Sequence, residues 1–185
     1  MMRRIDLAPL LRETVTTPYS DLVTRSTGAA LRNRIEQSLN GGGGTFRAIQ
    51  LDFTAVGLID FSCADEVVAK LLQRIVEDED HYVLLSGVDE HHFEAISHVL
   101  ERHGLSVAAF GPGPGPARVL GATSPDLATA FQAVQKLGAG DAKRLAEVLG
   151  WTVERAADAL QSLALRRLIF AAGGTFRPLP LPGDA

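Results

Sequence analysis

The side chains best suited to chemistry in this chain lie in one short run, FRAIQLDFTAVGLIDFSCADE (46–66). Ser62 is its only serine, and four neighbours can make polar contacts with a hydroxyl or with a partner: Asp60, Cys63, Asp65 and Glu66. A serine at the start of a helix can cap free backbone N–H groups, and the helix dipole favours added negative charge there. Ser62 is therefore a candidate helix cap and a candidate phosphorylation site.

These two roles for Ser62 predict different surroundings. As a cap, Ser62 would form a variant capping box with Asp65, three residues later. As a phosphoacceptor it would gain nearly two negative charges, favoured by the dipole but opposed by Asp65 and Glu66. The sequence alone leaves both roles open.

Other combinations of reactive side chains give no support to an enzyme. Asp52 and Asp60 form a possible acid–base pair, but no nucleophile–base set accompanies them. The four histidines of 91–103 include no i,i+4 pair, so we expect no metal site and no cofactor. The single cysteine, Cys63, is expected to be a small apolar residue in a helix.

The elements that must position Ser62 follow from hydrophobic spacing. Ile49, Leu51 and Phe53 alternate with polar residues, as in a strand with one core face. A tight connection then spans 54–60. Apolar residues at helical spacing predict a helix that begins next to Ser62: Phe61, Ala64, Val68, Leu71, Leu72 and Ile75.

Three segments, in order, resemble the STAS domain, the fold of bacterial anti-sigma factor antagonists. Its central segment is similar to LDFTAVGLIDFSCADEV in this chain. Its strand and first helix are similar to residues 22–39, with Ser26 or Thr27 as the cap. Its last strand, helix and strand are similar to residues 86–110. Ala-Asp-Glu after the serine, in place of Gly-Leu-Gly, is similar to a divergent STAS-like group.

The resemblance carries expectations about fold and partner. It implies an α/β domain with a STAS-like mixed sheet and helices. It also implies that Ser62 is phosphorylated by an anti-sigma-type kinase and that a protein partner binds at Asp60, Ser62, Cys63, Asp65 and Glu66.

A Gly-Pro segment, GPGPGPAR (111–118), predicts a domain boundary because it suits neither a helix nor a sheet ladder. We expect a STAS-like domain in residues 1–110, a linker in 111–123 and a second domain in 124–185.

The second domain is expected to contain three helices and a β-hairpin. Ser124, Asp141 and Thr152 each stand where a helix cap is needed, and Gly173-Gly174 suits the hairpin turn. This outline resembles a winged helix. The residues that could contact DNA are Lys143, Arg144, Thr152, Arg155, Arg166, Arg167 and Arg177, whereas Glu154 and Asp158 on the same exposed face would repel it.

Composition narrows the functional classes. The chain of 185 residues is 46% hydrophobic and 22% charged, as in ordinary globular proteins. Residues 1–124 carry 11 basic and 16 acidic side chains (−5), and residues 125–185 carry 7 and 6 (+1), so neither part is strongly basic. Without an apolar run of membrane-spanning length, we expect a cytoplasmic protein that does not bind membranes.

Two hypotheses follow. The first is a non-enzymatic bacterial regulator whose STAS-like domain binds a protein; the resemblance implies partner switching of the anti-sigma type. The alternative is a winged-helix transcription factor whose STAS-like domain dimerises or senses a signal. The partners in that case would be DNA and, in a homo-oligomer, a second copy of the same chain.

Overall fold

The computed structural model describes residues 2–15, 19–40, 48–76 and 81–179. Its strands are β1 (Met2–Asp6), β2 (Ala48–Asp52), β3 (Tyr82–Ser86), β4 (Ser106–Ala109), β5 (Arg118–Gly121), β6 (Ile169–Ala172) and β7 (Thr175–Pro178). Its helices are α1 (Leu7–Val15), α2 (Arg25–Asn40), α3 (Phe61–Ala64), the π-helical turn η1 (Asp65–Ala69), α4 (Lys70–Val76), α5 (Glu90–Arg102), α6 (Pro125–Leu137), α7 (Ala142–Leu149) and α8 (Val153–Leu165). The predicted α/β class with a mixed sheet is confirmed. No helix among these residues is long and apolar enough to cross a membrane.

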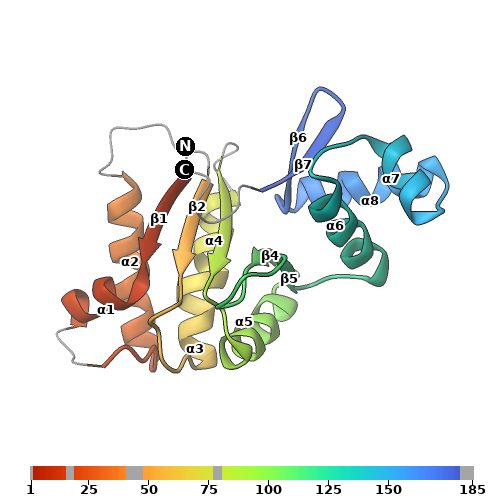
Figure 1. Cartoon of the computed structure of the whole chain (residues 1–185). Coiled ribbons are helices and arrows are strands. Elements are labelled where there is room, and N and C mark those ends of the chain that lie inside the picture. Colours follow the sequence, from red (N-terminus) through yellow and green to blue (C-terminus); the bar gives the residue numbers. More distant parts are fainter. Residues whose placement is uncertain (1, 16–18, 41–47, 77–80, 180–185) are drawn as a thin grey trace.

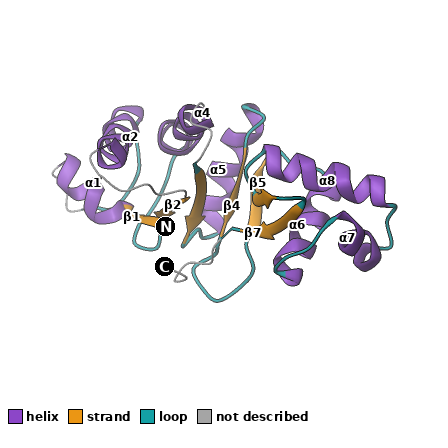
Figure 2. Cartoon of the chain, turned by 90° about the horizontal axis from the view of Figure 1, so that it is seen from above, coloured by secondary structure: helices purple, strands orange, loops and turns teal. Residues whose placement is uncertain are grey.

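The order of the main sheet determines where its helices lie. The strands run β1-β2-β3-β4-β5, and the first four are parallel, each next to the strand that precedes it in the chain. Crossovers between parallel strands are right-handed, so successive crossovers in one direction place their helices on one face. Figure 2 shows α1, α2, α4 and α5 in one layer, on the same side of the strands.

Alternation along the strands separates the two faces of the sheet. Ile49, Leu51 and Phe53 are at most 1% exposed and pack under the helices, so the predicted strand is present. The expectation of a single core face was wrong, because Gln50 and Asp52 between them are also buried. Because side chains of a strand alternate between faces, Gln50 and Asp52 of the same strand belong to the opposite face. We call this opposite face, which has no helix of the first layer on it, the open face.

Part of the open face is covered by the C-terminal helices and hairpin. Leu84, Ala108 and Phe110 belong to the same buried cluster as Phe131 of α6 and Leu163 of α8. Figure 1 places α6, α7, α8 and the β6-β7 hairpin beside the β4-β5 side of the sheet. The second hydrophobic core therefore includes both the sheet and the C-terminal unit.

The C-terminal unit contains the predicted elements. Side-chain oxygens of Ser124, Asp141 and Thr152 accept hydrogen bonds from backbone N–H groups at the starts of α6, α7 and α8, as predicted. Gly173 and Gly174 have φ angles of 59° and 77° in the turn between β6 and β7, a conformation that glycine adopts easily.

Several predictions for the first 123 residues were wrong. Strand β1 and helix α1 precede the segment where the first strand was expected, and Leu22 makes only an isolated bridge to Ile59. The hydroxyl of Thr24, and not Ser26 or Thr27, accepts the N–H of Thr27. The expected linker 111–123 contains β5, which pairs antiparallel with β4 despite the preceding Gly-Pro run.

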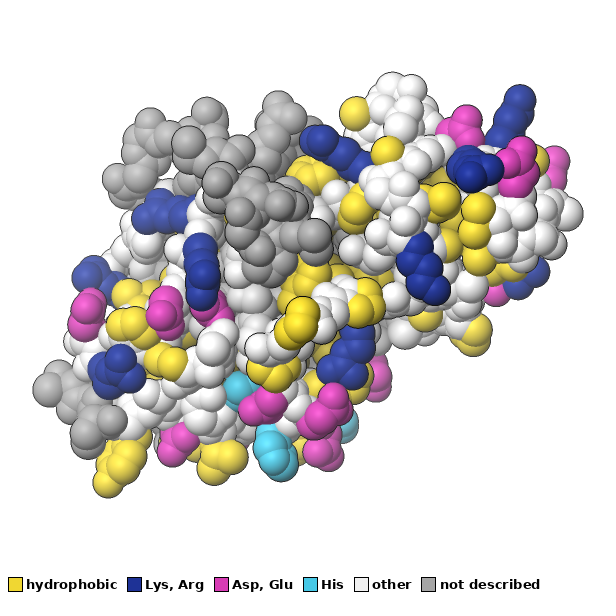
Figure 3. Space-filling view, viewed as in Figure 1, with side chains coloured by type: hydrophobic (Ala, Val, Ile, Leu, Met, Phe, Trp, Pro, Cys, Tyr) yellow, Lys and Arg dark blue, Asp and Glu magenta, His cyan; other side chains and the backbone are white. Residues whose placement is uncertain are grey.

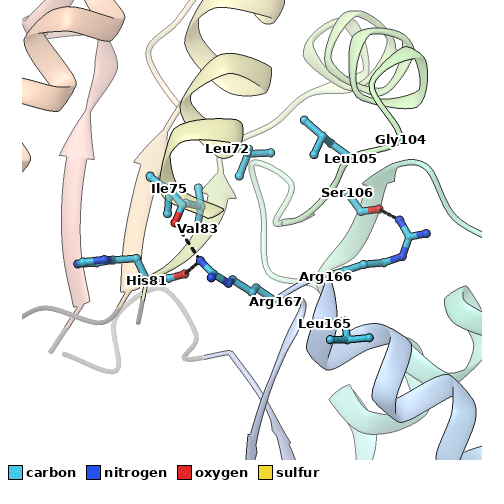
Figure 4. A pocket seen from close by; sticks show the side chains of 10 residues that line it. All are labelled: Leu72, Ile75, His81, Val83, Gly104, Leu105, Ser106, Leu165, Arg166 and Arg167. Carbon is cyan, nitrogen blue, oxygen red and sulfur yellow. Dashed lines mark hydrogen bonds between the residues drawn. The ribbon is translucent and has the colours of Figure 1, made fainter. Parts of the chain in front are cut away.

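Two arginines at the end of α8 connect the C-terminal unit to the sheet and to the helical layer. Arg166 donates a hydrogen bond to the hydroxyl of Ser106 (2.9 Å). Arg167 donates to the carbonyl oxygens of Ile75 (3.0 Å) and His81 (3.1 Å), as Figure 4 shows. A cation at the last carbonyls of a helix also interacts favourably with the helix dipole, so Arg167 stabilises the end of α4.

This connection gives a stability prediction. Arg167→Ala should lower the free energy of unfolding by about 2 kcal/mol, because two hydrogen bonds from a charged donor are lost. Arg167→Gly should lower it less, since Arg167 has a φ of 56° that glycine adopts without strain. Denaturant unfolding would measure both. The exposed Arg177, which lies over the Phe170 ring, is the control, and a larger loss in Arg177→Ala would contradict the prediction.

Candidate functional site

The predicted site lies where two chain segments run side by side at the carboxyl end of β2. The N–H of Leu22 donates to the carbonyl oxygen of Leu58 (2.7 Å), and the N–H of Asp60 donates to the carbonyl oxygen of Leu22 (2.9 Å). The segment 19–24 and the connection 54–60 are therefore held together just before α3 begins.

Asp60, and not Ser62, caps helix α3. One carboxylate oxygen of Asp60 accepts hydrogen bonds from the Cys63 N–H (2.8 Å) and the Ser62 hydroxyl (2.9 Å). The other oxygen accepts from the Thr24 N–H (2.9 Å). The predicted capping box of Ser62 and Asp65 was wrong, because the chain enters the helix two residues earlier.

The hydrogen bonds also set the charge state of Asp60. Burial raises its pKa, but hydrogen bonds from the N–H groups of Cys63 and Thr24 and from the Ser62 hydroxyl together lower it below its ordinary value. Asp60 is thus a stable anion that joins the helix to the neighbouring segment, with Ser62 half-buried beside it.

Two of the five predicted partner-binding residues are buried, which corrects that prediction. Cys63 is 0% exposed, and its thiol donates to the carbonyl oxygen of Thr24. Burial, followed by the charge of Asp60, raises the pKa of the Cys63 thiol to about 12, so it is not a reactive thiolate. Glu66 is 3% exposed. Neither side chain can form a direct contact surface.

Glu66 instead forms an internal ion-pair network with three cations: Arg25, Arg32 and Lys70. Burial raises the pKa of Glu66, and its hydrogen bonds with Lys70 and Arg25 outweigh that effect and lower it. Arg25 also pairs with Asp65 (2.8 Å). The two carboxylates that follow Ser62 are therefore neutralised by cations, which reduces their repulsion of any added phosphate.

The same end of the domain exposes apolar side chains that the spacing did not identify. Phe61, which the helical spacing groups with residues that are buried, is itself 54% exposed, and its ring lies 4.9 Å from the His98 ring. Leu58 is 60% exposed, and Val23 and Tyr19 on the adjacent segment are 43% and 69% exposed. We call Tyr19, Val23, Leu58 and Phe61 the apolar surface. In Figure 3, yellow side chains protrude along the lower edge, the end at which α3 begins.

Among the DNA-binding candidates, Arg155 is engaged within the C-terminal unit. It forms two hydrogen bonds with the carboxylate of Asp126 (2.8 and 2.6 Å) and lies over the Trp151 ring. These bonds raise the pKa of Arg155 and lower that of Asp126. A nucleic acid would have to displace Asp126 to use this guanidinium.

The other candidates are dispersed. Arg166 and Arg167 contact the first domain, and Thr152 caps α8. Arg144 pairs with Glu147 (3.2 Å), Arg177 lies over Phe170, and Lys143 is exposed on α7. Arg155, Arg166 and Arg167 are thus held by contacts within the protein, which leaves them less available to a nucleic acid.

No protein-family model matches this chain, and neither a curated protein nor a solved structure is significantly similar to it. The functional argument therefore depends on the residues and geometry described above.

The reassigned cap gives a prediction with a pH dependence. Asp60→Ala should lower the free energy of unfolding at pH 7 by about 1–2 kcal/mol, and Ser62→Ala by less, since only one hydroxyl bond is lost. Because folding lowers the pKa of Asp60, its stabilising effect should disappear as the pH falls through and below its ordinary value of 3.8.

Asp60→Asn is the matched control, because asparagine can cap the helix but does not titrate in this range. Denaturant unfolding between pH 7 and pH 3 should show a weaker acid destabilisation for this variant than for the wild type. A larger cost for Ser62→Ala than for Asp60→Ala would restore Ser62 as the cap.

Proposed function

We propose that this protein is a non-enzymatic regulator in which a STAS-like domain binds a protein partner through the apolar surface. The observation that carries this proposal is the exposure of Leu58 and Phe61 on both sides of Asp60, next to the half-buried Ser62. Aromatic and aliphatic side chains that are exposed together are typical of a protein-binding site.

The backbone beneath the apolar surface is held rigidly, which supports this role. His92 is 1% exposed and contacts the carbonyl oxygen of Gly57 through Nε2 (2.6 Å). The N–H of Leu58 donates to the carboxylate of Asp21 (2.8 Å). Side chains presented by an ordered loop lose less conformational entropy on binding, so these contacts favour affinity.

Ser62 provides a means of regulation in this proposal. Phosphorylation would add a dianion beside Asp60, whose carboxylate lies 2.9 Å from the hydroxyl. The repulsion and the added hydration would weaken apolar contacts at Phe61. A kinase of the anti-sigma type is the partner that this arrangement and the STAS resemblance favour, with the C-terminal unit acting as a winged helix that makes protein contacts.

The docking prediction uses variants of exposed residues. Phe61→Ala and Leu58→Ala should each weaken partner binding at least tenfold, because they remove apolar contact area. Proteins captured from native extract by the wild type and by each variant would be compared by quantitative mass spectrometry. The partner is the protein that the wild type captures and both variants fail to capture. Its affinity for each purified variant can then be measured. Leu165→Ala on α8 is the control, since Leu165 is 77% exposed and distant in sequence.

The same affinity measurement tests Ser62. Ser62→Asp should weaken partner binding, while Ser62→Ala should bind as the wild type does; melting temperatures of both variants separate loss of binding from loss of folding. An aspartate variant that binds normally would exclude the phosphorylation switch. Normal binding by both apolar-surface variants would exclude the docking site itself.

The DNA-binding alternative has less support, because three of its arginines make internal contacts. We expect fluorescence anisotropy to show no salt-dependent binding of duplex DNA. If DNA does bind, Lys143→Ala should decrease the slope of log affinity against log salt by about one unit, since Lys143 is exposed. Asp158→Ala should not decrease this slope, because it removes an acidic charge that would repel DNA. Salt-dependent binding in the wild type would favour the transcription-factor alternative.

A further inference from the structure

A pocket of about 410 Å³ lies on the open face of the sheet, at the carboxyl ends of β2 and β3. Its lining includes Arg4, Gln50, Asp52, Thr54, Ser86 and Phe110, and the Gly-Pro segment 111–115 forms one wall. The volume is within the range of pockets that bind small molecules. None of these residues belongs to the apolar surface, so the pocket is a separate feature.

The floor of the pocket contains an incompletely bonded amide. Gln50 is 1% exposed, and its amide nitrogen donates to the hydroxyl of Ser86 (2.7 Å), itself 7% exposed. Among the described residues, the amide oxygen of Gln50 has no hydrogen-bond partner. A buried acceptor of this kind favours a ligand that carries a hydrogen-bond donor.

The rim of the pocket contains a positioned guanidinium. Asp52 is 2% exposed, and one of its carboxylate oxygens accepts hydrogen bonds from the N–H (3.0 Å) and the hydroxyl (2.6 Å) of Thr54. Its other oxygen accepts hydrogen bonds from Nε (2.9 Å) and Nη2 of Arg4. These bonds fix one edge of the guanidinium, while the Arg4 side chain remains 62% exposed. An arginine held in this way can present its other N–H groups to a carboxylate.

The Gln50 amide and the Arg4 guanidinium belong to residues that line the same pocket from neighbouring strands. Arg4 and Gln50 are directly paired in the parallel ladder of β1 and β2, where adjacent strands lie about 4.8 Å apart. The Arg4 guanidinium lies against Asp52, two residues beyond Gln50 on β2, so a molecule with a hydroxyl a few bonds from its carboxylate can contact both Arg4 and Gln50. Because Asp52 occupies one edge of the Arg4 guanidinium, the free edge can bind one planar carboxylate of a ligand through parallel hydrogen bonds.

We propose that this pocket binds a small hydroxycarboxylate, with its carboxylate on Arg4 and its hydroxyl donating to Gln50. Thr54 and Asp52 orient Arg4, Ser86 orients Gln50, and Phe110 forms an apolar wall. This binding site goes beyond the proposed docking function and does not depend on it.

Isothermal titration calorimetry of the full chain with L-malate tests the proposal. For malate we expect a dissociation constant below about 1 millimolar. Succinate, which lacks the hydroxyl, should bind at least tenfold more weakly. Erythritol, which lacks the carboxylates, should not bind. Arg4→Gln and Gln50→Leu should each weaken malate binding at least tenfold. Arg3→Gln is the matched control, because Arg3 is on the same strand but contacts Ser38 of α2.

Melting curves establish that each variant is folded, and Gln50→Glu provides a second test at the floor, where an added negative charge should repel the ligand. Amide chemical shifts of the wild-type protein offer a measurement that needs no variant: malate should perturb Ser86, Gly87 and Gly111. No heat and no shift changes at 10 millimolar malate would overturn the proposal, as would unchanged affinity in Arg4→Gln. Equal binding of malate and succinate would overturn the role of Gln50.

Discussion

Each parallel strand of the main sheet is added on the same side of the previous one, and this order constrains the rest of the molecule. Right-handed crossovers then place every helix of the first layer on one face. The other face needs a different cover wherever its side chains are apolar, as Leu84 and Ala108 are. The C-terminal unit supplies that cover beside β4 and β5, while the polar side chains of Gln50 and Asp52 leave a pocket near β1 and β2.

At the carboxyl end of β2, the hydrogen bonds of Asp60 determine the shape of the candidate site. Its two carboxylate oxygens connect the start of α3 to the segment that carries Val23. This arrangement fixes the helix start early enough to direct Phe61 outward, against His98, and to leave Ser62 in the first turn. The network around Glu66 then neutralises the charges that follow. Packing and electrostatics thus produce a surface that is apolar at its edge and has a hydroxyl at its centre.

Local signals in the sequence predicted local structure well. Caps at Ser124, Asp141 and Thr152 depend on neighbours within three residues, and all three were predicted. The alternation of Ile49, Leu51 and Phe53 likewise identified a buried face. Beyond these positions, the predictions depended on contacts with distant parts of the chain.

Most of the wrong predictions concern such distant contacts, whereas the caps expected at Ser62 and at Ser26 or Thr27 failed locally, because Asp60 and Thr24 accept the N–H groups instead. Strand β1 is recognisable mainly through its pairing with β2, more than 40 residues later, and β5 follows a Gly-Pro run but pairs with β4. The helical spacing grouped Phe61 with the buried residues of its helix. Phe61 is nevertheless exposed, because the first turn of this helix extends beyond the core. The Arg4–Asp52 pair, and hence the pocket, requires the sheet register, which the local sequence pattern did not reveal.

The shared second core also has a consequence for biosynthesis. A ribosome adds roughly 5–20 residues per second, so the sheet emerges several seconds before α6 and α8 are complete. During that interval, Leu84, Ala108 and Phe110 lack the partners with which they are buried in the finished chain. The polar groups of Arg4, Gln50 and Asp52 lie on the same face and interrupt it. They reduce the apolar area that a nascent chain would present to chaperones or to other copies of itself.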